Sequence, residues 1–221
     1  MNQKDRGFMI KRLCMTLGGV VVCAFSVGMF RISAFGVDPF QCFAHGIHNP
    51  LAQVISFGSL YTILNLLLLV AVFFLDRHKI GIATFINLFL TGYICDFSEK
   101  MLGRMLPDPS LGVRFILLLL AVVIMCVGSA LYFTSNLGVS TYDAIALSLG
   151  ERKLKVFGHI APFKFIRIFT DCVCVIIGTI FGEIPGLGTI VTAFFMGPLI
   201  DFFNRHLAEP MLYGKGGKQA A

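Results

Sequence analysis

The stretch that decides the fold is NLGVSTYD at residues 136–143, because an earlier version of it, AFGVDPFQ, stands at residues 34–41. In both versions Gly-Val is followed by a small polar residue, and an aromatic side chain stands four positions after the glycine. Two later motifs follow each version: GIAT and GYICD at residues 81–84 and 92–96, then GLGT and GPLID at residues 186–189 and 197–201. Their opening glycines are eleven positions apart in each case, so the chain contains two copies of one unit.

The composition is that of an integral membrane protein. Hydrophobic residues make up 57% of the 221 residues and charged residues 14%, and the mean hydropathy is +0.84. Charged residues make up about a quarter of a soluble domain. The net charge of +6 comes from basic residues that lie mostly in loops between apolar runs, which argues against a nucleic-acid partner. The cysteines form no C-x-x-C pair, so we expect them to fill apolar helices.

Six apolar stretches are long enough to cross the hydrocarbon layer of a membrane as helices. They cover residues 13–34, 54–75, 80–100, 113–135, 161–181 and 184–204. If the N-terminus lies inside the cell, all but four of the 18 Lys and Arg residues fall on the cytoplasmic side, the four being Arg31, Lys100, Arg104 and Arg114. The positive-inside rule therefore predicts a multi-pass protein of the bacterial inner membrane with both termini in the cytoplasm.

These features predict an all-α membrane protein with six transmembrane helices in two inverted three-helix repeats. Each copy has three spans, an odd number, so the second copy enters the membrane from the opposite side, as in many secondary transporters. A short re-entrant or interfacial helix follows the first span of each repeat, at residues 39–48 and 140–149. The expected segments are a cytoplasmic N-terminal segment at 1–12, a first repeat at 13–104, a second repeat at 112–208 and a cytoplasmic tail at 209–221.

The turns before the two short helices contain Gly36, on the external side, and Gly138, on the cytoplasmic side. We expect Asp38 to cap the first short helix, and Ser140 or Thr141 the second. Opposed helices of this kind would aim the positive ends of their dipoles at a shared interior, which suits a carboxylate or another anionic group. The alternative is a pair of interfacial helices that seal the bundle, since caps occur at helix starts of every kind.

Five polar side chains are candidate substrate contacts: Asn65, Thr84, Asp143, Asp171 and Thr189. Asp171 stands near the middle of the fifth span, where a carboxylate costs about 2.5 to 3.5 kcal/mol to insert, so it needs a partner or a watery cavity. Arg167 lies one helical turn earlier and can pair with it, either as a structural ion pair or as part of a substrate or proton site. Asn65 likewise fits a hydrogen bond between helices as well as a ligand contact.

Several residues are candidate gate or turn positions. They are Gly36, Asp38, Gly138 and Ser140 at the turns, and Asp96 and Asp201 at the far ends of the third and sixth spans. Solvated helix ends are the alternative interpretation of Asp96 and Asp201. His45 and His48 have no acidic cluster beside them, so we expect surface histidines and no metal site. No cofactor is expected.

The motifs at 136–143, 186–189 and 197–201 resemble those of the bacterial inner-membrane proteins called YitT/YczE-like. The YczE branch is the more similar, because the chain stops soon after the last span without the small cytoplasmic domain of YitT-type members. The likeness is tightest from Gly128 to Phe203 and looser in the first copy, where Gln41 stands in place of Asp143. The resemblance implies an integral membrane protein and no defined activity.

The leading functional hypothesis is a transporter or permease for a small polar or anionic solute, with its site between the two repeats. Asp171 is the candidate for proton coupling or cation pairing. Two alternatives stay open: a solute-binding subunit of a multi-component transporter, and a non-transporting scaffold or regulator. An enzyme is not expected, because the sequence has no H-E-x-x-H, nucleophile-elbow or Walker A motif. The expected partners are the lipid bilayer and the solute, and a homodimer is compatible with the sequence.

Overall fold

A computed structural model describes residues 3–55, 57–151, 155–156, 159–160 and 163–214. The long and short α-helices are α1 (Gln3–Ser33), α2 (Pro39–His48), α3 (Phe57–Asp76), α4 (Ile82–Met105), α5 (Leu111–Ser135), α6 (Thr141–Glu151), α7 (Phe163–Ile180), α8 (Leu187–Phe203) and α9 (Glu209–Tyr213). Short helical segments η1 (Asn49–Leu51), η2 (Arg77–Lys79) and η3 (Asn204–Ala208) extend or join them. A two-residue antiparallel pair, β1 (Lys155–Val156) with β2 (His159–Ile160), lies between α6 and α7. The predicted all-α class is confirmed.

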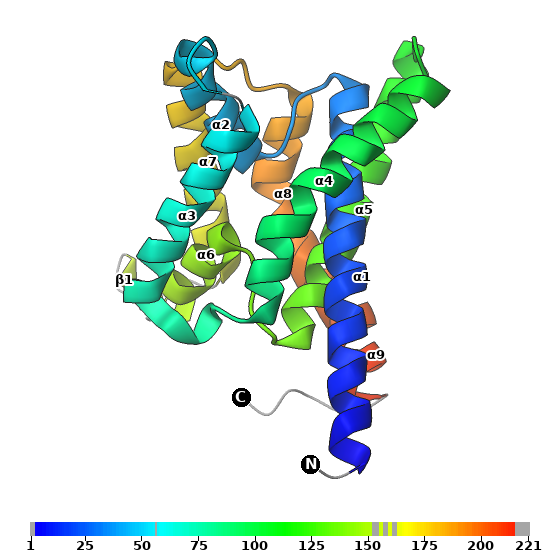
Figure 1. Ribbon diagram of the computed structural model, residues 1–221, viewed down its shortest axis with the longest axis vertical. Helices are drawn as coiled ribbons and strands as arrows, with labels where there is room; N and C mark the ends of the chain where they lie inside the picture. Colours follow the sequence, from blue (N-terminus) through cyan, green and yellow to red (C-terminus); the bar gives the residue numbers. More distant parts are fainter. Residues whose placement is uncertain (1–2, 56, 152–154, 157–158, 161–162, 215–221) are drawn as a thin grey trace.

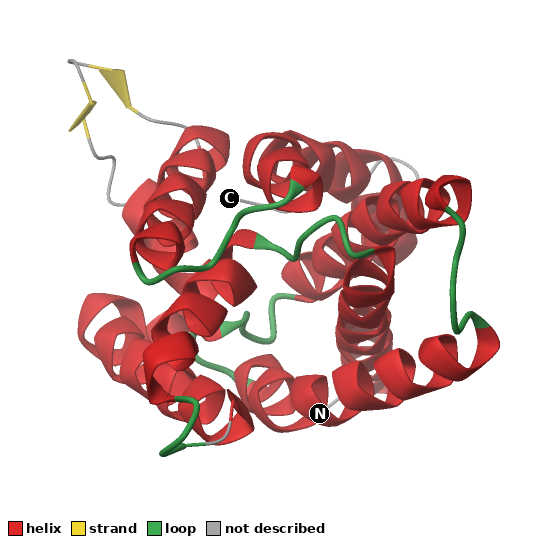
Figure 2. Cartoon of the chain, turned by 90° about the horizontal axis from the view of Figure 1, so that it is seen from above, coloured by secondary structure: helices red, strands yellow, loops and turns green. Residues whose placement is uncertain are grey.

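The long helices run between the two ends of the molecule in alternate directions. In Figure 1, α1, α4 and α7 rise from the lower end, and α3, α5 and α8 return to it. The short helix α2 lies at the upper end and α6 in the lower half, while α9 and the start of α1 share the lower end. Seen from above in Figure 2, the β1–β2 pair projects from the edge of the helical body.

The centre of the bundle is the contact between α1 and α5, the first helix of each copy. Small residues allow the close approach: a Cβ added at Gly19 would come within 2.7 Å of the Gly128 carbonyl oxygen, and one at Gly128 within 2.8 Å of the Cys23 nitrogen. The largest apolar cluster, which includes Phe30 and Leu118, is shared by α1, α5 and α8.

The turn after α1 lies against the start of α8. Gly36 has φ +102°, a conformation that favours glycine, and a Cβ there would come within 2.8 Å of the Gly186 backbone and 2.7 Å of Thr189 Oγ1. The Gly188 amide donates a 2.7 Å hydrogen bond to the Phe35 carbonyl oxygen. The first glycine motif of the first copy therefore packs on the second motif of the other copy.

The turn after α5 lies against the start of α4 in the same way. Gly138 has φ +104°, and a Cβ there would come within 2.6 Å of the Gly81 nitrogen and 2.9 Å of Thr84 Oγ1. The Ala83 amide donates a 3.0 Å hydrogen bond to the Leu137 carbonyl oxygen. The two turns thus make matching contacts, each with the half of the chain that does not contain it.

Within the described residues, four helices are long and apolar enough to cross a membrane: Asp5–Ser33, Ser59–Lys79, Leu111–Ser135 and Leu187–Tyr213. They correspond to the first, second, fourth and sixth predicted spans and indicate a membrane protein. The third and fifth predicted spans form α4 and α7, apart from residues 161–162, which lie outside the described chain. That these two helices also cross the membrane stays a prediction.

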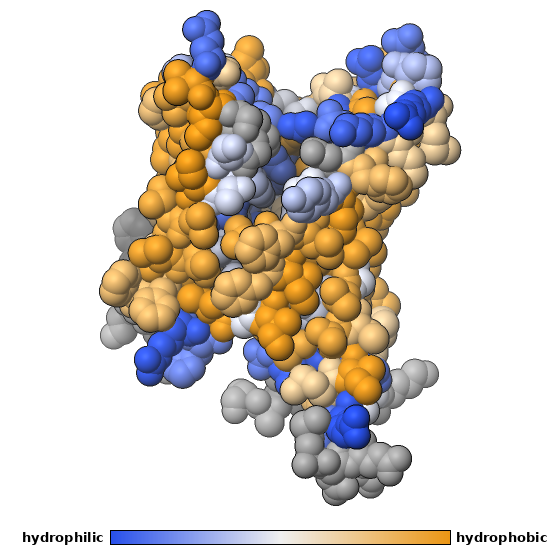
Figure 3. Space-filling view, viewed as in Figure 1, coloured by the Kyte–Doolittle hydropathy of each residue, from blue (hydrophilic) through white to orange (hydrophobic). Residues whose placement is uncertain are grey.

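The outer surface nevertheless carries apolar stripes on α4 and α7 as well. On α4 the exposed side chains of Phe85, Phe89 and Phe97 recur at multiples of four residues, so they share one face of the helix. On α7 Phe169 and Ile176 are exposed on one face. Figure 3 shows the resulting apolar surface over the middle of the molecule, with hydrophilic side chains at the two ends and in a hollow between the α2–α3 lobe and upper α4. Contiguous exposed apolar surface of this extent is typical of contact with lipid.

Candidate functional site

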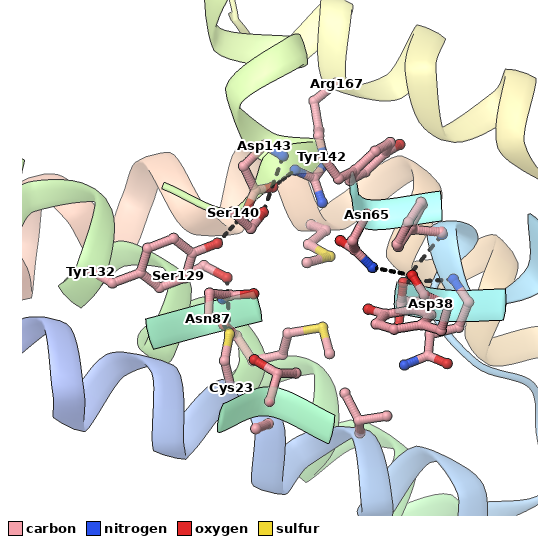
Figure 4. A pocket seen from close by; sticks show the side chains of 18 residues that line it. Cys23, Asp38, Asn65, Asn87, Ser129, Tyr132, Ser140, Tyr142, Asp143 and Arg167 are labelled. Carbon is pink, nitrogen blue, oxygen red and sulfur yellow. Dashed lines mark hydrogen bonds and ion pairs between the residues drawn. The ribbon is translucent and has the colours of Figure 1, made fainter. Parts of the chain in front are cut away.

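A cavity of about 90 Å³ lies in the middle of the bundle, and every helix from α1 to α8 contributes to its lining. We call it the central cavity. Its polar side chains come from both copies of the repeat, among them Asp38 and Asn65 from the first and Tyr132 and Asp143 from the second. Figure 4 shows these side chains pointing toward a common space, with Asp38 set apart from the group around Arg167.

Arg167 of α7 carries the positive charge at this cavity. Its guanidinium forms an ion pair with Asp143, and its Nε lies 3.3 Å from Asp171 Oδ2. The three residues are 4%, 5% and 0% exposed, so one buried guanidinium is shared by two buried carboxylates. The pairing of Arg167 with Asp171 that the spacing predicted is confirmed, whereas the contact with Asp143 was not predicted.

Hydroxyl groups donate further hydrogen bonds to both carboxylates. Tyr132 and Ser140 donate to Asp143, the latter over 2.6 Å, and Tyr142 donates to Asp171. Each carboxylate therefore accepts hydrogen bonds from the guanidinium and from at least one hydroxyl. Such a satisfied buried network holds its members in one geometry.

The short helices α2 and α6 begin beside this network, with the caps that the sequence predicted. Asp38 Oδ1 accepts hydrogen bonds from the Phe40 and Gln41 amides at 3.1 and 3.2 Å. Ser140 Oγ accepts the Asp143 amide at 3.1 Å, so Ser140 rather than Thr141 caps α6. Both predicted caps are confirmed, and both turn residues, Asp38 and Ser140, line the central cavity.

The aromatic residues of the repeated motif meet each other. The rings of Phe40 and Tyr142 stack with centroids 5.0 Å apart and an interplanar angle of 19°. The Arg167 guanidinium lies over the ring of Tyr142, 4.7 Å from the ring centroid. The equivalent positions of the two copies therefore form one aromatic pair at the wall of the cavity.

The charges at the cavity do not favour an anion. The helix starts of α2 and α6 already face carboxylates of the chain itself, Asp38 and Asp143. Among the described residues that line the cavity, Arg167 is the one basic side chain, and it is paired with two carboxylates. Asp38 lies in the turn between α1 and α2, where burial raises its pKa to about 6 against the lowering effect of its backbone hydrogen bonds.

Asn65 fits both interpretations that the sequence left open, a hydrogen bond between helices and a ligand contact. Its side-chain oxygen accepts a 2.8 Å hydrogen bond from Thr141 of α6, and its amide donates to the Tyr61 carbonyl oxygen at 2.9 Å. It also lines the central cavity. The hydrogen bond between helices is thus confirmed, and the same side chain stands at the wall of the site.

Thr84 and Thr189 lie elsewhere, although the sequence grouped them with the substrate contacts. Thr84 is 2% exposed and donates a 2.7 Å hydrogen bond to the Val139 carbonyl oxygen. Thr189 is 1% exposed beside the turn at Gly36. Neither is among the described residues that line the cavity. Both stand in the first turn of their helices, at the ends of the predicted spans, and there they hold the turn of the other copy.

Two further cavities lie toward the ends of the molecule. The first, the vestibule, has about 680 Å³, is lined by α1 to α4 and shares Val27, Gln41, Tyr61 and Thr91 with the central cavity. The second has about 520 Å³, lies at the opposite end beside η2 and the end of α5, and shares no described lining residue with the central cavity. The central cavity therefore adjoins one end cavity, with four wall residues in common, and has no described wall residue in common with the other.

The predicted gate residues occupy different places. Asp201 lies at the 520 Å³ cavity and forms an exposed ion pair with Arg205 at 3.0 Å, which matches a solvated helix end. Asp96 belongs to α4, but its side chain lies outside the described residues. Gly36 and Gly138 form the turn contacts described above and do not line the central cavity.

The sequence missed several polar residues at the cavity, among them Tyr132, Asn87 and Thr91. Tyr132 lies in α5, and Asn87 and Thr91 both lie in α4; polar side chains within predicted spans were the available signal. Gln41 was noted because it replaces the acid of the second copy, and it proves to line both the central cavity and the vestibule.

Comparison with known proteins gives a family but no activity. An uncharacterized protein from Haemophilus influenzae is 22% identical over 199 residues, which cover 90% of this chain and 86% of that protein. No solved structure matches the chain. Residues 10–205 match the model of a protein family described as a family of unknown function, DUF6198. The chain therefore belongs to the DUF6198 family.

Proposed function

We propose that the protein is a six-span membrane transporter for a small solute, built from two inverted repeats that enclose the central cavity. The alternating helix directions, the apolar stripes on α4 and α7, and the matching turn contacts at Gly36 and Gly138 support this architecture. In this arrangement a pseudo-two-fold axis in the membrane plane relates the copies, as in many secondary transporters. The likeness to YitT/YczE-like proteins is part of the same proposal.

The proposed orientation puts both termini in the cytoplasm of the bacterial inner membrane. The positive-inside bias of the sequence supports it, and α9 and the start of α1 share one end of the molecule. The vestibule then opens to the exterior, and the 520 Å³ cavity beside His78 and Lys79 faces the cytoplasm.

One observation carries the transport proposal: the central cavity adjoins the cavity at one end through four shared wall residues, and it shares no described wall residue with the cavity at the other end. Alternating access requires such a state, together with a second one in which the connection is reversed. Relative motion of the two repeats would open the cytoplasmic side. In this proposal the buried carboxylates bind Arg167 or the solute and carry out no reaction, so the protein is not an enzyme.

The charges favour a neutral polar or cationic solute over an anionic one. The cavity holds the carboxylates of Asp38 and Asp143 against the single guanidinium of Arg167 among its described lining residues. An anion would therefore meet two like charges, unless it displaced one carboxylate from Arg167. Asp171, which pairs with the same guanidinium, remains the candidate for coupling transport to a proton.

The test is cysteine accessibility from both sides of the membrane, which needs no known substrate. Asn87→Cys places a thiol in the central cavity of a chain whose seven native cysteines are replaced by alanine. Two controls, Thr62→Cys in the vestibule and His78→Cys in the opposite cavity, report one side each. A transporter should allow impermeant thiol reagents to reach Asn87→Cys in both right-side-out and inverted vesicles.

Labelling of Asn87→Cys from the vestibule side alone, under every condition, would contradict transport. That outcome would favour a solute-binding subunit that works with a separate complex, because the vestibule would still lead to a binding cavity. Absence of labelling from either side would point to the scaffold or regulator instead.

A further inference from the structure

We propose that the central cavity binds a small ammonium-type cation, with Asp38 supplying the negative charge and Gln41 and Thr91 supplying further oxygen acceptors. This rests on the proposed function and names the class of its solute. The three residues lie on the path from the vestibule: Gln41 and Thr91 line both cavities, and Asp38 lines the central one.

Two oxygen atoms at this junction accept no hydrogen bond from the described chain. They are Oε1 of Gln41 and Oγ1 of Thr91, both shielded from solvent. Gln41 is 7% exposed as a residue. A buried polar atom without a partner costs about 1–3 kcal/mol. Gln41 Oε1 can only accept, so it favours a ligand that brings hydrogen-bond donors into the cavity, and the Thr91 hydroxyl can accept from the same ligand. An ammonium group offers donors and no acceptor.

The charge of Asp38 has no direct counter-charge. Its Oδ1 accepts two backbone amides, and no Lys or Arg side chain of the described residues forms an ion pair with it. Arg167, the basic residue that lines the same cavity, forms its ion pairs with Asp143 and Asp171. A cation at the junction would supply the missing positive charge.

Aromatic rings cover the same part of the cavity. The Phe40 ring lies 5.6 Å from the Tyr61 ring, and both residues line the central cavity together with Asp38 and Gln41. The Phe40 ring is also stacked on the Tyr142 ring, so these aromatic side chains exclude water beside Asp38, and the attraction between opposite charges is stronger where water is excluded. The volume of about 90 Å³ limits the ligand to a few heavy atoms, which is why methylammonium is a suitable probe.

The experiment measures the thermal unfolding midpoint of the full-length protein in detergent as methylammonium chloride replaces sodium chloride at constant ionic strength. A ligand that binds the folded state raises the midpoint with its occupancy. Sodium acetate serves as the anion probe. We expect a rise with methylammonium that saturates, and none with acetate.

Variants locate the site. Asp38→Asn keeps a good helix cap but loses the charge, and Gln41→Leu removes the unpartnered oxygen; each should weaken methylammonium binding about tenfold or more, since an ionic or buried hydrogen bond is involved. Ser148→Ala is the matched control, because Ser148 Oγ is also buried without a partner but lies outside the central cavity. It should bind methylammonium like the unchanged protein.

A midpoint that rises with acetate and not with methylammonium would overturn the cation proposal and favour an anionic solute. An equal loss of binding in Ser148→Ala and Gln41→Leu would overturn the site, because the effect would then be general. No midpoint change with methylammonium would also refute the proposal. None of these results bears on two-sided labelling of Asn87→Cys, so transport and cation binding fail separately.

Discussion

Alanine at Gly81 or Gly186 should destabilise the protein strongly, and alanine at Gly92 should not. The backbone at Gly81 (φ −149°, ψ −170°) and Gly186 (φ −87°, ψ 178°) suits any residue, so the effect is purely steric. A Cβ at Gly81 would lie 2.1 Å from the Leu137 carbonyl oxygen, and one at Gly186 2.0 Å from that of Phe35. Both obstacles are backbone atoms and cannot rotate away.

The magnitude follows from the size of the required shift. A carbon and a carbonyl oxygen approach to about 3.3–3.6 Å, so each turn must move by more than ~1 Å. Overpacking of this kind costs about 1–3 kcal/mol. Losing the neighbouring hydrogen bond, which joins Ala83 to Leu137 in one turn and Gly188 to Phe35 in the other, adds about 0.5–1.5 kcal/mol. We expect each variant to lose about 2–4 kcal/mol of unfolding free energy.

Gly92→Ala is the matched control within α4. A Cβ at Gly92 meets nothing within 4 Å, and alanine is favoured over glycine in a helix by about 1 kcal/mol. The assay is denaturant titration in detergent micelles, followed by circular dichroism. Equal stability of Gly81→Ala, Gly186→Ala and Gly92→Ala would refute the tight crossing of the turns, and a loss at one of the two positions alone would refute their equivalence.

Three further predictions concern the charged groups and the topology. Arg167→Met leaves two buried carboxylates without their cation and should cost about 3–5 kcal/mol of unfolding free energy. Denaturant titration measures the loss, and an unfolding free energy equal to that of the unchanged protein would contradict the buried network. Methylammonium affinity should fall as the pH is lowered through about 6, because protonation of Asp38 removes the attracting charge. Burial raises the pKa of Asp38 to about 6, although the charge of Arg167 lowers it. Calorimetric titration checks this prediction, and Asp38→Asn should abolish the pH dependence. Val54→Cys, at a position 85% exposed at the α2 end, should react with an impermeant thiol reagent outside intact cells, whereas native Cys42, 1% exposed, should stay unreacted; reaction from the cytoplasmic side would reverse the proposed orientation.

Local features of this structure could be predicted from the sequence. The capped starts of α2 and α6 follow from Asp38 and Ser140, whose side chains act within three residues of the chain. The pair of Arg167 and Asp171 follows from the four-residue spacing on one helix. Both depend on geometry that a single helix fixes, whatever packs around it.

Contacts between distant parts of the chain could not be predicted in the same way. Arg167 reaches Asp143 across 24 positions and two helices, and periodicity within one element contains no information about that approach. The repeat showed that Gly36 and Gly138 are equivalent, but not that each would pack on the second motif of the other copy. For that reason Thr84 and Thr189, which are equivalent buried residues of the two copies, were assigned to the solute and instead hold the turns.

The crossed contacts of the turns have a consequence for biosynthesis. When the first three long helices have left the ribosome, Gly186 has not yet been made, so the turn at Gly36 has no surface to close against. The newly inserted half must wait in the lipid with that turn open until the last helix is inserted. The turn at Gly138 can close earlier, because Gly81, on which it packs, precedes it in the chain. A chain severed between α4 and α5 should therefore mature only when its two fragments are made in the same cell.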